Sequence, residues 1–332
     1  MAQPYTERWA LTIQYQLHPE LLLEVGYVGS HSLHLPVSEN LDFTPGRYLS
    51  TSPFRDQATI DRLTANVANP FQNLLPGTNM NGSTIANSAL LVPYPQFTGV
   101  TKSSVTDGYS NFHAFQMRLE KRLSHGIQLL SNLTISRTME ATGRLNASDP
   151  VYEYITADQD RPYRLVMSGS YDLPFGKGKA FLGSAGRWMN RLVGGWAASG
   201  IFVLQGSAPL GWGNLLYNGG DLNLDPRNID HTFDTTRFNT NSTQQLGSNI
   251  RTFSSRFSNL RGDAINNLDV SLIKNTAITE RVNLQFRAES FNLANRPQFS
   301  TPNLSATSTN FGKVTSQANF ARLIQLGLRL TW

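Results

Sequence analysis

The segment 321–332, ARLIQLGLRLTW, alternates between apolar and polar residues up to its last position. Leu326, Leu328, Leu330 and Trp332 fall on one face of an extended strand, and the residues between them fall on the other. Because side chains alternate between the two faces of a β-strand, a period of two predicts a strand with one apolar surface. Chain ends usually fray into polar tails, so a regular strand here indicates a structural role for the terminus.

The same alternation recurs along the chain and predicts nine strands in an all-β, antiparallel fold. The other eight segments are 7–17, 20–30, 112–123, 126–138, 161–173, 196–206, 266–278 and 281–293. They are longer than the five or six residues that are usual for strands in soluble sheets. Their length matches the roughly 9–11 residues that a tilted strand needs to cross a bilayer.

Short and long connections alternate between these strands. The short ones lie at 18–19, 124–125 and 279–280, and the long ones are 31–110, 138–160, 207–264 and 293–319. In outer-membrane barrels the short turns face the periplasm and the long loops face the outside. We therefore expect part of a transmembrane β-barrel, in which these four long segments are extracellular loops.

The connection at 176–195 departs from this alternation, because it is long where a short periplasmic turn is expected. Its apolar residues have helical spacing, and Lys177, Lys179, Arg187 and Arg191 supply positive charge. This pattern predicts a short amphipathic helix at the periplasmic membrane surface. An ordinary packed helix within the turn is the alternative.

The number of predicted strands indicates whether the barrel is complete. If the last strand ends in the periplasm, nine strands place the start of the first one outside the cell. Bacterial barrels have an even number of strands, with both termini inside. We therefore expect an incomplete barrel, the C-terminal portion of a longer protein. Residues 1–17 have no signal-peptide pattern, and no apolar stretch reaches the length of about 20 residues that a membrane helix needs.

Composition excludes several classes of function. The chain has 332 residues and no cysteine, which rules out disulfides, thiolate metal sites and cysteine nucleophiles. Charged residues make up 15%, against about 25% in typical soluble domains. The 28 Lys and Arg residues give a formal charge of +5 but form no basic run, so we expect no nucleic-acid partner.

Few residues suggest a chemical site. His31 and His34 have the spacing of metal ligands on a helix, but they follow a strand and lack a third ligand, so we interpret them as loop histidines. Trp212, Tyr217 and Phe233 fall in a long loop, where they either stack on a ligand or, as we favour, pack the loop. We assign no catalytic, cofactor-binding or metal residue, leave the substrate-binding residues unknown, and expect no enzyme.

One segment resembles the start of a calcium-binding loop. Asp221, Asn223 and Asp225 have the spacing of its first three ligands. The sixth position is Pro226 in place of glycine, and the twelfth is Thr232 in place of glutamate. This departure leaves at most weak calcium binding in an extracellular loop.

Four stretches, 158–179, 192–210, 258–299 and 318–332, resemble the C-terminal barrel of TonB-dependent outer-membrane receptors. They begin DQDRPYRL, LVGGWAAS, SNLRGDAI and ANFARLIQ. The resemblance extends to the first strand and to nearly everything from residue 108 onward. It is strongest to the Oar-like group, whose members carry a carboxypeptidase-regulatory-like domain at the N-terminus.

This resemblance implies a Gram-negative outer-membrane barrel of about 22 strands with a plug in its lumen. Such receptors take up a scarce extracellular solute with energy relayed from the inner membrane. The regulatory-like domain, the plug and the energy-coupling box are absent from this chain, so an energy-coupling protein would be reached only through that N-terminal part. The resemblance implies no cofactor.

The resemblance also assigns a role to the last strand. Leu326, Leu328, Leu330 and Trp332 match the outer-membrane insertion signal that the barrel-assembly machinery recognises, and they would face the outer-membrane lipid. Two alternatives remain: a passive pore or adhesin-like surface barrel closed by oligomerisation, and a soluble β-sandwich that binds a ligand.

Overall fold

A computed structural model describes residues 2–224 and 228–332. Nine long strands form one antiparallel sheet, in which each strand pairs with the next long strand along the chain. Across the sheet they are β1 (Tyr5–His18), β2 (Leu21–Asn40), β5 (Thr101–Ser124), β6 (Ile127–Ala141), β8 (Tyr163–Asp172), β9 (Trp196–Gln205), β12 (Ile265–Ala277), β13 (Asn283–Phe291) and β14 (Leu323–Thr331). This up-and-down order confirms the predicted all-β, antiparallel class.

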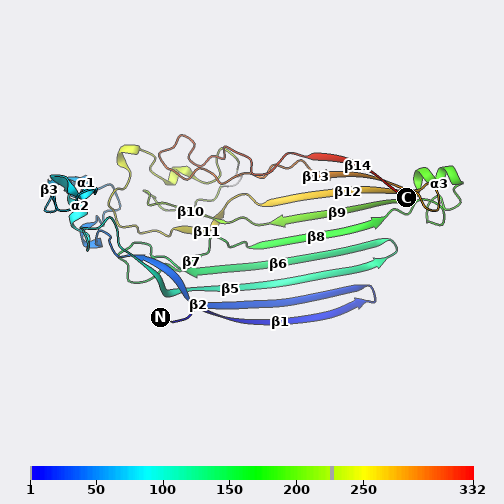
Figure 1. The fold of residues 1–332 in the computed structure, drawn as a ribbon, viewed down its shortest axis with the longest axis horizontal. Coiled ribbons are helices and arrows are strands. Elements are labelled where there is room, and N and C mark those ends of the chain that lie inside the picture. The colour runs from blue at the N-terminus through cyan, green and yellow to red at the C-terminus, as the bar shows by residue number, and fades with distance from the viewer. Residues whose placement is uncertain (1, 225–227) are drawn as a thin grey trace.

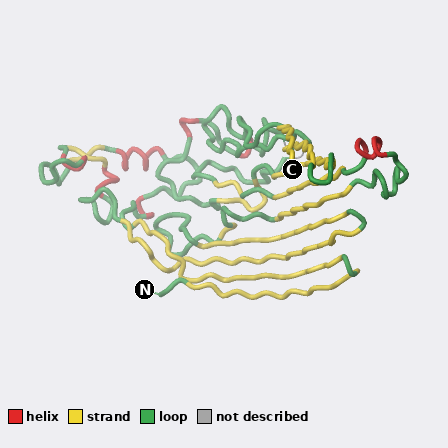
Figure 2. Tube along the Cα trace, turned by 45° about the vertical axis from the view of Figure 1, so that its right-hand side comes forward, coloured by secondary structure: helices red, strands yellow, loops and turns green. Residues whose placement is uncertain are grey.

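The sheet is curved and open. Figure 2 shows the strands wrapping around one side of the molecule, and Figure 1 shows β1 and β14 at opposite edges. Among the described residues, β1 pairs only with β2, and β14 pairs only with β13. Each edge therefore carries a row of backbone groups without a neighbouring strand.

The pairing gathers the apolar residues of successive strands on one face. Ile13 lies opposite Val25, which lies opposite Met117; Met117 in turn lies opposite Leu133, which lies opposite Leu165. On the same face Leu272 of β12 lies opposite Ala288 of β13, which lies opposite Leu326 of β14, so this surface is largely apolar from edge to edge. An apolar band of this kind is the lipid-facing surface of a transmembrane barrel, and we call it the lipid face; the opposite side of the sheet is the polar face.

The two ends of the sheet differ, as Figure 1 shows. Tight turns join β1 to β2, β5 to β6 and β12 to β13 at one end, where the helix α3 (Arg187–Val193) lies between β8 and β9. Long loops fill the other end. We call the first the periplasmic end and the second the extracellular end, following the rule for outer-membrane barrels.

Two of the four expected extracellular loops, 31–110 and 138–160, have the wrong boundaries. Residues 31–110 were expected to form one loop, but β2 continues to Asn40 and β5 begins at Thr101, and these two residues pair. Likewise β6 continues into the expected loop 138–160 and pairs with the two-residue β7 (Ile155–Thr156). The pairing of β2 with β5 is irregular beyond Ser32 but continues to Asn40, so the hydropathy pattern alone underestimates the strands.

The loops contain short elements of their own. They are η1 (Gly46–Tyr48), α1 (Gln57–Thr64), β3 (Asn66–Ala68), η2 (Asn79–Asn81), β4 (Thr84–Ala86), α2 (Asn87–Leu90), β10 (Pro209–Gly211), η3 (Thr235–Arg237), η4 (Ser242–Gln244) and β11 (Arg256–Arg261). Asp56 caps the N-terminus of the helix α1, because its carboxylate accepts a hydrogen bond from the Thr59 amide. None of the described helices is long and apolar enough to cross a membrane.

The hydrophobic core lies in these loops, not in the sheet. Phe233 is fully buried, and Trp212 contacts it edge-on at 4.9 Å between ring centroids and stacks on Phe238 at 5.1 Å. Phe311, from the loop after β13, packs against Phe233 at 5.3 Å and so joins the two loops. Trp212 and Phe233 are therefore packing residues, as favoured over ligand stacking, and Tyr217 packs at the edge of the same cluster.

Candidate functional site

Paired charges lie on the polar face of the sheet. Arg118 contacts Glu120 at 2.7 Å and lies opposite Glu24 on the neighbouring strand. On the same face, but near the opposite edge of the sheet, Arg287 contacts Glu289 at 3.5 Å. These pairs are part-exposed, so each adds at most about 1 kcal/mol to stability. Their main consequence is a polar, hydrated surface in the middle of a membrane-spanning sheet, which is suited to a water-filled interior.

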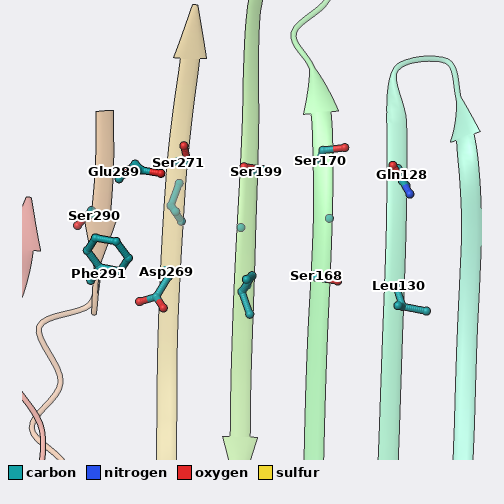
Figure 3. A pocket seen from close by; sticks show the side chains of 14 residues that line it. Gln128, Leu130, Ser168, Ser170, Ser199, Asp269, Ser271, Glu289, Ser290 and Phe291 are labelled. Atoms are coloured by element: carbon teal, nitrogen blue, oxygen red, sulfur yellow. The ribbon is translucent and has the colours of Figure 1, made fainter. Parts of the chain in front are cut away.

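A hollow of about 470 Å³ lies on this polar face, across β6, β8, β9, β12 and β13. Figure 3 shows its floor, where Ser168, Ser170, Ser199 and Ser271 follow one another across three strands. Small side chains in register leave space between the larger residues at its ends. The Ser271 hydroxyl is buried and has no hydrogen-bond partner within the described part of the chain.

Acidic side chains border the hollow on one side. Asp269 Oδ1 accepts hydrogen bonds from the Asn267 amide side chain at 3.0 Å and from the Asn292 backbone amide at 2.8 Å. Glu289, also at the border, is paired with Arg287. Serine hydroxyls both donate and accept hydrogen bonds, and the neighbouring carboxylates repel negative charge. The hollow is therefore better suited to water or to a neutral, hydroxyl-rich solute than to an anion.

Buried and part-buried ion pairs hold the loops to the strands. Arg261 Nη2 lies 2.6 Å from Asp160 Oδ2, and Asp160 is only 1% exposed. The second oxygen of Asp160 accepts a hydrogen bond from the Thr138 amide at 2.6 Å. Arg256 makes a similar pair with Glu140 at 2.7 Å. These contacts join β11 to the outer ends of β6 and β7, so the long loop has a fixed position over the sheet.

A hydrogen-bond network joins the outer end of β2 to the long loop after β6. Glu39 Oε1 accepts hydrogen bonds from Arg144 at 2.6 Å and from the Tyr152 hydroxyl at 2.8 Å. Burial, together with the hydrogen bond to Glu39, raises the pKa of Tyr152 to about 12. Tyr152 therefore remains a neutral donor at any physiological pH.

A second cavity, of about 440 Å³, opens between the outer ends of β8 and β9 and the loops. Tyr163, Ile229 and Phe299 form apolar walls, and Asp263 brings a carboxylate. Asp263 Oδ2 accepts a hydrogen bond from the Phe299 amide at 2.9 Å, so this acidic residue also positions the wall. The cavity gives the extracellular end a mixed apolar and polar pocket.

The residues that resembled metal ligands do not assemble into a site. His31 and His34 lie within β2, not in a loop; His31 bonds to Asn111, and His34 bonds to the Thr106 carbonyl at 3.1 Å. Asp221 accepts two hydrogen bonds from Asn223 in a local turn. Asp225 and Pro226 of the calcium-like pattern lie outside the described residues, and the Thr232 hydroxyl donates a hydrogen bond to the Gly312 carbonyl at 2.6 Å. Within residues 2–224 and 228–332 no group of three metal-binding side chains occurs.

The C-terminal residues singled out from the sequence share the lipid face. Leu326, Leu328 and Leu330 lie opposite Ala288, Phe286 and Leu284 of β13. The Leu328 side chain is 72% exposed and Trp332 is 88% exposed. An apolar edge strand this exposed would promote aggregation in water. In a membrane the same side chains contact the acyl chains of the lipid.

The hollow on the polar face and the Glu39 network were not anticipated. A usable signal for the hollow was present: serines occupy the polar positions of three successive strands at the same height. Recognising it requires the register between strands, which alternation within one strand does not provide.

A family model for the outer membrane beta barrel domain matches residues 1–325. The chain belongs to this family. It is accordingly a protein of the outer membrane of Gram-negative bacteria. No curated protein matches the chain in sequence.

The barrel domain is similar to two solved structures. One is the outer membrane transporter YddB from Escherichia coli, with a TM-score of 0.46 and 10% identity, covering 99% of this chain and 32% of that one. The other is P. aeruginosa FpvA bound to heterologous pyoverdines, with a TM-score of 0.41 and 11% identity, covering 98% and 27%. The chain thus spans about a third of the length of the first and less of the second.

Proposed function

We propose that this barrel domain forms part of the wall of an outer-membrane transporter that takes up a scarce extracellular solute. The observation that carries the proposal is the polar face: charge pairs and a serine-lined hollow occupy the side of the sheet opposite the lipid face. A sheet that is apolar outside and polar inside surrounds a hydrated path. Extracellular loops with a pocket at their base support access from outside.

The wall must be completed by further strands. Unpaired backbone groups cost several kcal/mol each in hydrocarbon, so β1 and β14 need partners within the membrane. In the proposal those partners belong to a larger barrel of the Oar-like, TonB-dependent kind. Its plug and energy-coupling box would close the lumen and contact the coupling protein. The sequence resemblance supports this assignment.

The last strand has a separate proposed role in assembly. Leu326, Leu328, Leu330 and Trp332 would be recognised by the barrel-assembly machinery before they face lipid. Their common face and their exposure at the edge of the sheet support this role.

The test of energised uptake uses cells that carry or lack the gene. Uptake of labelled sugars and iron chelates is compared with and without a protonophore that collapses the inner-membrane gradient. The proposal predicts that uptake of at least one probe needs both the gene and the gradient. Uptake that needs the gene but persists without the gradient, together with a permanent conductance of the purified protein in planar bilayers, would instead assign a passive pore.

A pair of variants connects uptake to the hollow. Ser199→Leu fills the floor of the hollow, whereas Ala198→Leu adds similar bulk one residue away on the lipid face. We expect S199L to lower uptake of the identified probe several-fold and A198L to leave it unchanged, with equal amounts of folded protein. Equal uptake by the two variants would exclude the hollow from the solute path.

A further inference from the structure

The connection between β8 and β9, at 173–195, exposes apolar side chains at the periplasmic end. On α3, Trp188 is 77% exposed and Leu192 is 69% exposed; Phe181 and Leu182 in the preceding loop are also exposed. Figure 1 places α3 beyond the ends of the strands, beside the C-terminus. Exposed apolar side chains clustered in this way indicate a contact surface.

An apolar groove of about 420 Å³ runs beneath this segment. Phe175, Leu182 and Leu192 line it, together with Trp196 of β9 and Leu272 of β12. Leu272 lies opposite Ala198 and Ala288 in the register, so it belongs to the lipid face. The groove is therefore continuous with the surface that meets the acyl chains of the membrane.

The segment that lines the groove also carries cations. Lys177, Lys179 and Arg187 are exposed, and none of the ion pairs in the described part of the chain involves them. Residues 173–195 contain no Asp or Glu. Lys274 adds a charge 5.1 Å above the ring of Trp196, which lines the groove, and donates a hydrogen bond to the Gly194 carbonyl at 2.7 Å. Exposed cations without ion-pair partners, in the same segment as an apolar groove, are complementary to an anionic headgroup.

The segment is held in one orientation against the sheet. Arg191 donates a hydrogen bond to the Ile278 carbonyl at 3.2 Å, and the Trp196 indole donates one to the Leu192 carbonyl at 3.1 Å. Gly176 has φ +114°, and a Cβ there would lie 2.7 Å from Asn190 Oδ1. The chain therefore passes close over the helix only because this residue is glycine.

We propose that the segment 173–195 binds an anionic glycerophospholipid of the periplasmic leaflet. One acyl chain lies in the groove against Leu272, and the phosphate lies among Lys177, Lys179 and Arg187. The patch thus fixes the height of the sheet in the membrane at its periplasmic end, independently of what the barrel transports.

The test measures lipid retained by the protein extracted from outer membranes in a mild detergent. The protein is equilibrated with equal amounts of phosphatidylglycerol and phosphatidylethanolamine of identical acyl chains, and bound lipid is counted by native mass spectrometry. The double variant K177Q/K179Q removes two exposed charges from the patch. The matched control, K102Q/K313Q, removes two charges at the extracellular end. Heat-modifiable gel migration confirms folding of each.

The native protein is expected to retain phosphatidylglycerol in preference, and K177Q/K179Q to lose this preference by about fivefold or more, since each lysine near a membrane surface is worth about that factor. Raised salt should weaken the preference in the native protein. No preference in the native protein, or an equal loss in the control, overturns the proposal. Retention of a periplasmic protein in place of lipid, lost in K177Q/K179Q, would also overturn it.

Discussion

At the scale of single residues, the membrane-spanning and extracellular parts of the chain follow different rules. In the sheet, exposed leucines and part-exposed ion pairs are stable because one face meets lipid and the other meets water. In the loops the ordinary rules of soluble proteins return, with a buried aromatic core and with buried charges that are paired. Two residue-scale predictions concern the loops.

The first concerns the buried pair of Asp160 and Arg261. Replacing Asp160 by Asn leaves a cation without its carboxylate, and breaking a buried pair costs about 3 kcal/mol. We expect D160N to increase hydrogen exchange of the backbone amides in β11 and the loop around it. The control R237Q breaks the part-exposed pair of Arg237 with Asp234, which is worth at most about 1 kcal/mol. Similar exchange in both variants would contradict the anchoring role of Asp160.

The second concerns Tyr152, whose pKa is raised from 10.0 to about 12. The folded state holds the phenolic proton more tightly than the unfolded state, so the stabilisation is complete below pH 10 and is lost as pH rises to about 12. The phenolate absorbance is titrated in the native protein and in Y152F, and the second curve is subtracted from the first. The difference curve, which reports Tyr152 alone, should be centred near pH 12. A difference curve centred near pH 10 would show that the bond to Glu39 is not formed.

At the scale of elements, alternation predicts strand existence well and strand ends poorly. The nine long strands follow from period-two patterns because lipid enforces an apolar residue at every second position. The extension of β2 to Asn40 and of β5 back to Thr101 was missed, although Leu33, Leu35 and Val37 continue the alternation in β2; the pairing of Asn40 with Thr101 appears only in the register between the strands. The serine-lined hollow was missed for the same reason, since it also depends on register between strands.

The element-scale prediction contrasts the two faces of β14. An arginine on the lipid face near the bilayer centre costs about 2–4 kcal/mol, whereas a lumen position tolerates it. We expect Leu328→Arg to lower the free energy of unfolding by that amount, and to lower the amount of heat-modifiable protein in outer membranes. Gln325→Arg, on the polar face of the same strand, should do neither. Equal effects of the two would mean that the register of β14 is wrong.

At the scale of the whole molecule, one open sheet separates two environments. Tight turns and α3 lie at one end, and loops with their own core lie at the other (Figure 1). Family membership places this sheet in the outer membrane. The central claim is therefore one of orientation: strands cross the membrane with the tight turns in the periplasm and the cored loops outside the cell.

The most direct test uses the absence of cysteine from the chain. Single cysteines are introduced at the exposed loop positions Gln72 and Thr309, and at Ser184 and Glu280 at the opposite end. Intact cells are treated with a membrane-impermeant maleimide, before and after permeabilisation of the outer membrane. We predict that Q72C and T309C are labelled in intact cells, and that S184C and E280C are labelled only after permeabilisation. Labelling of S184C and E280C in intact cells, with Q72C and T309C protected, would contradict the account.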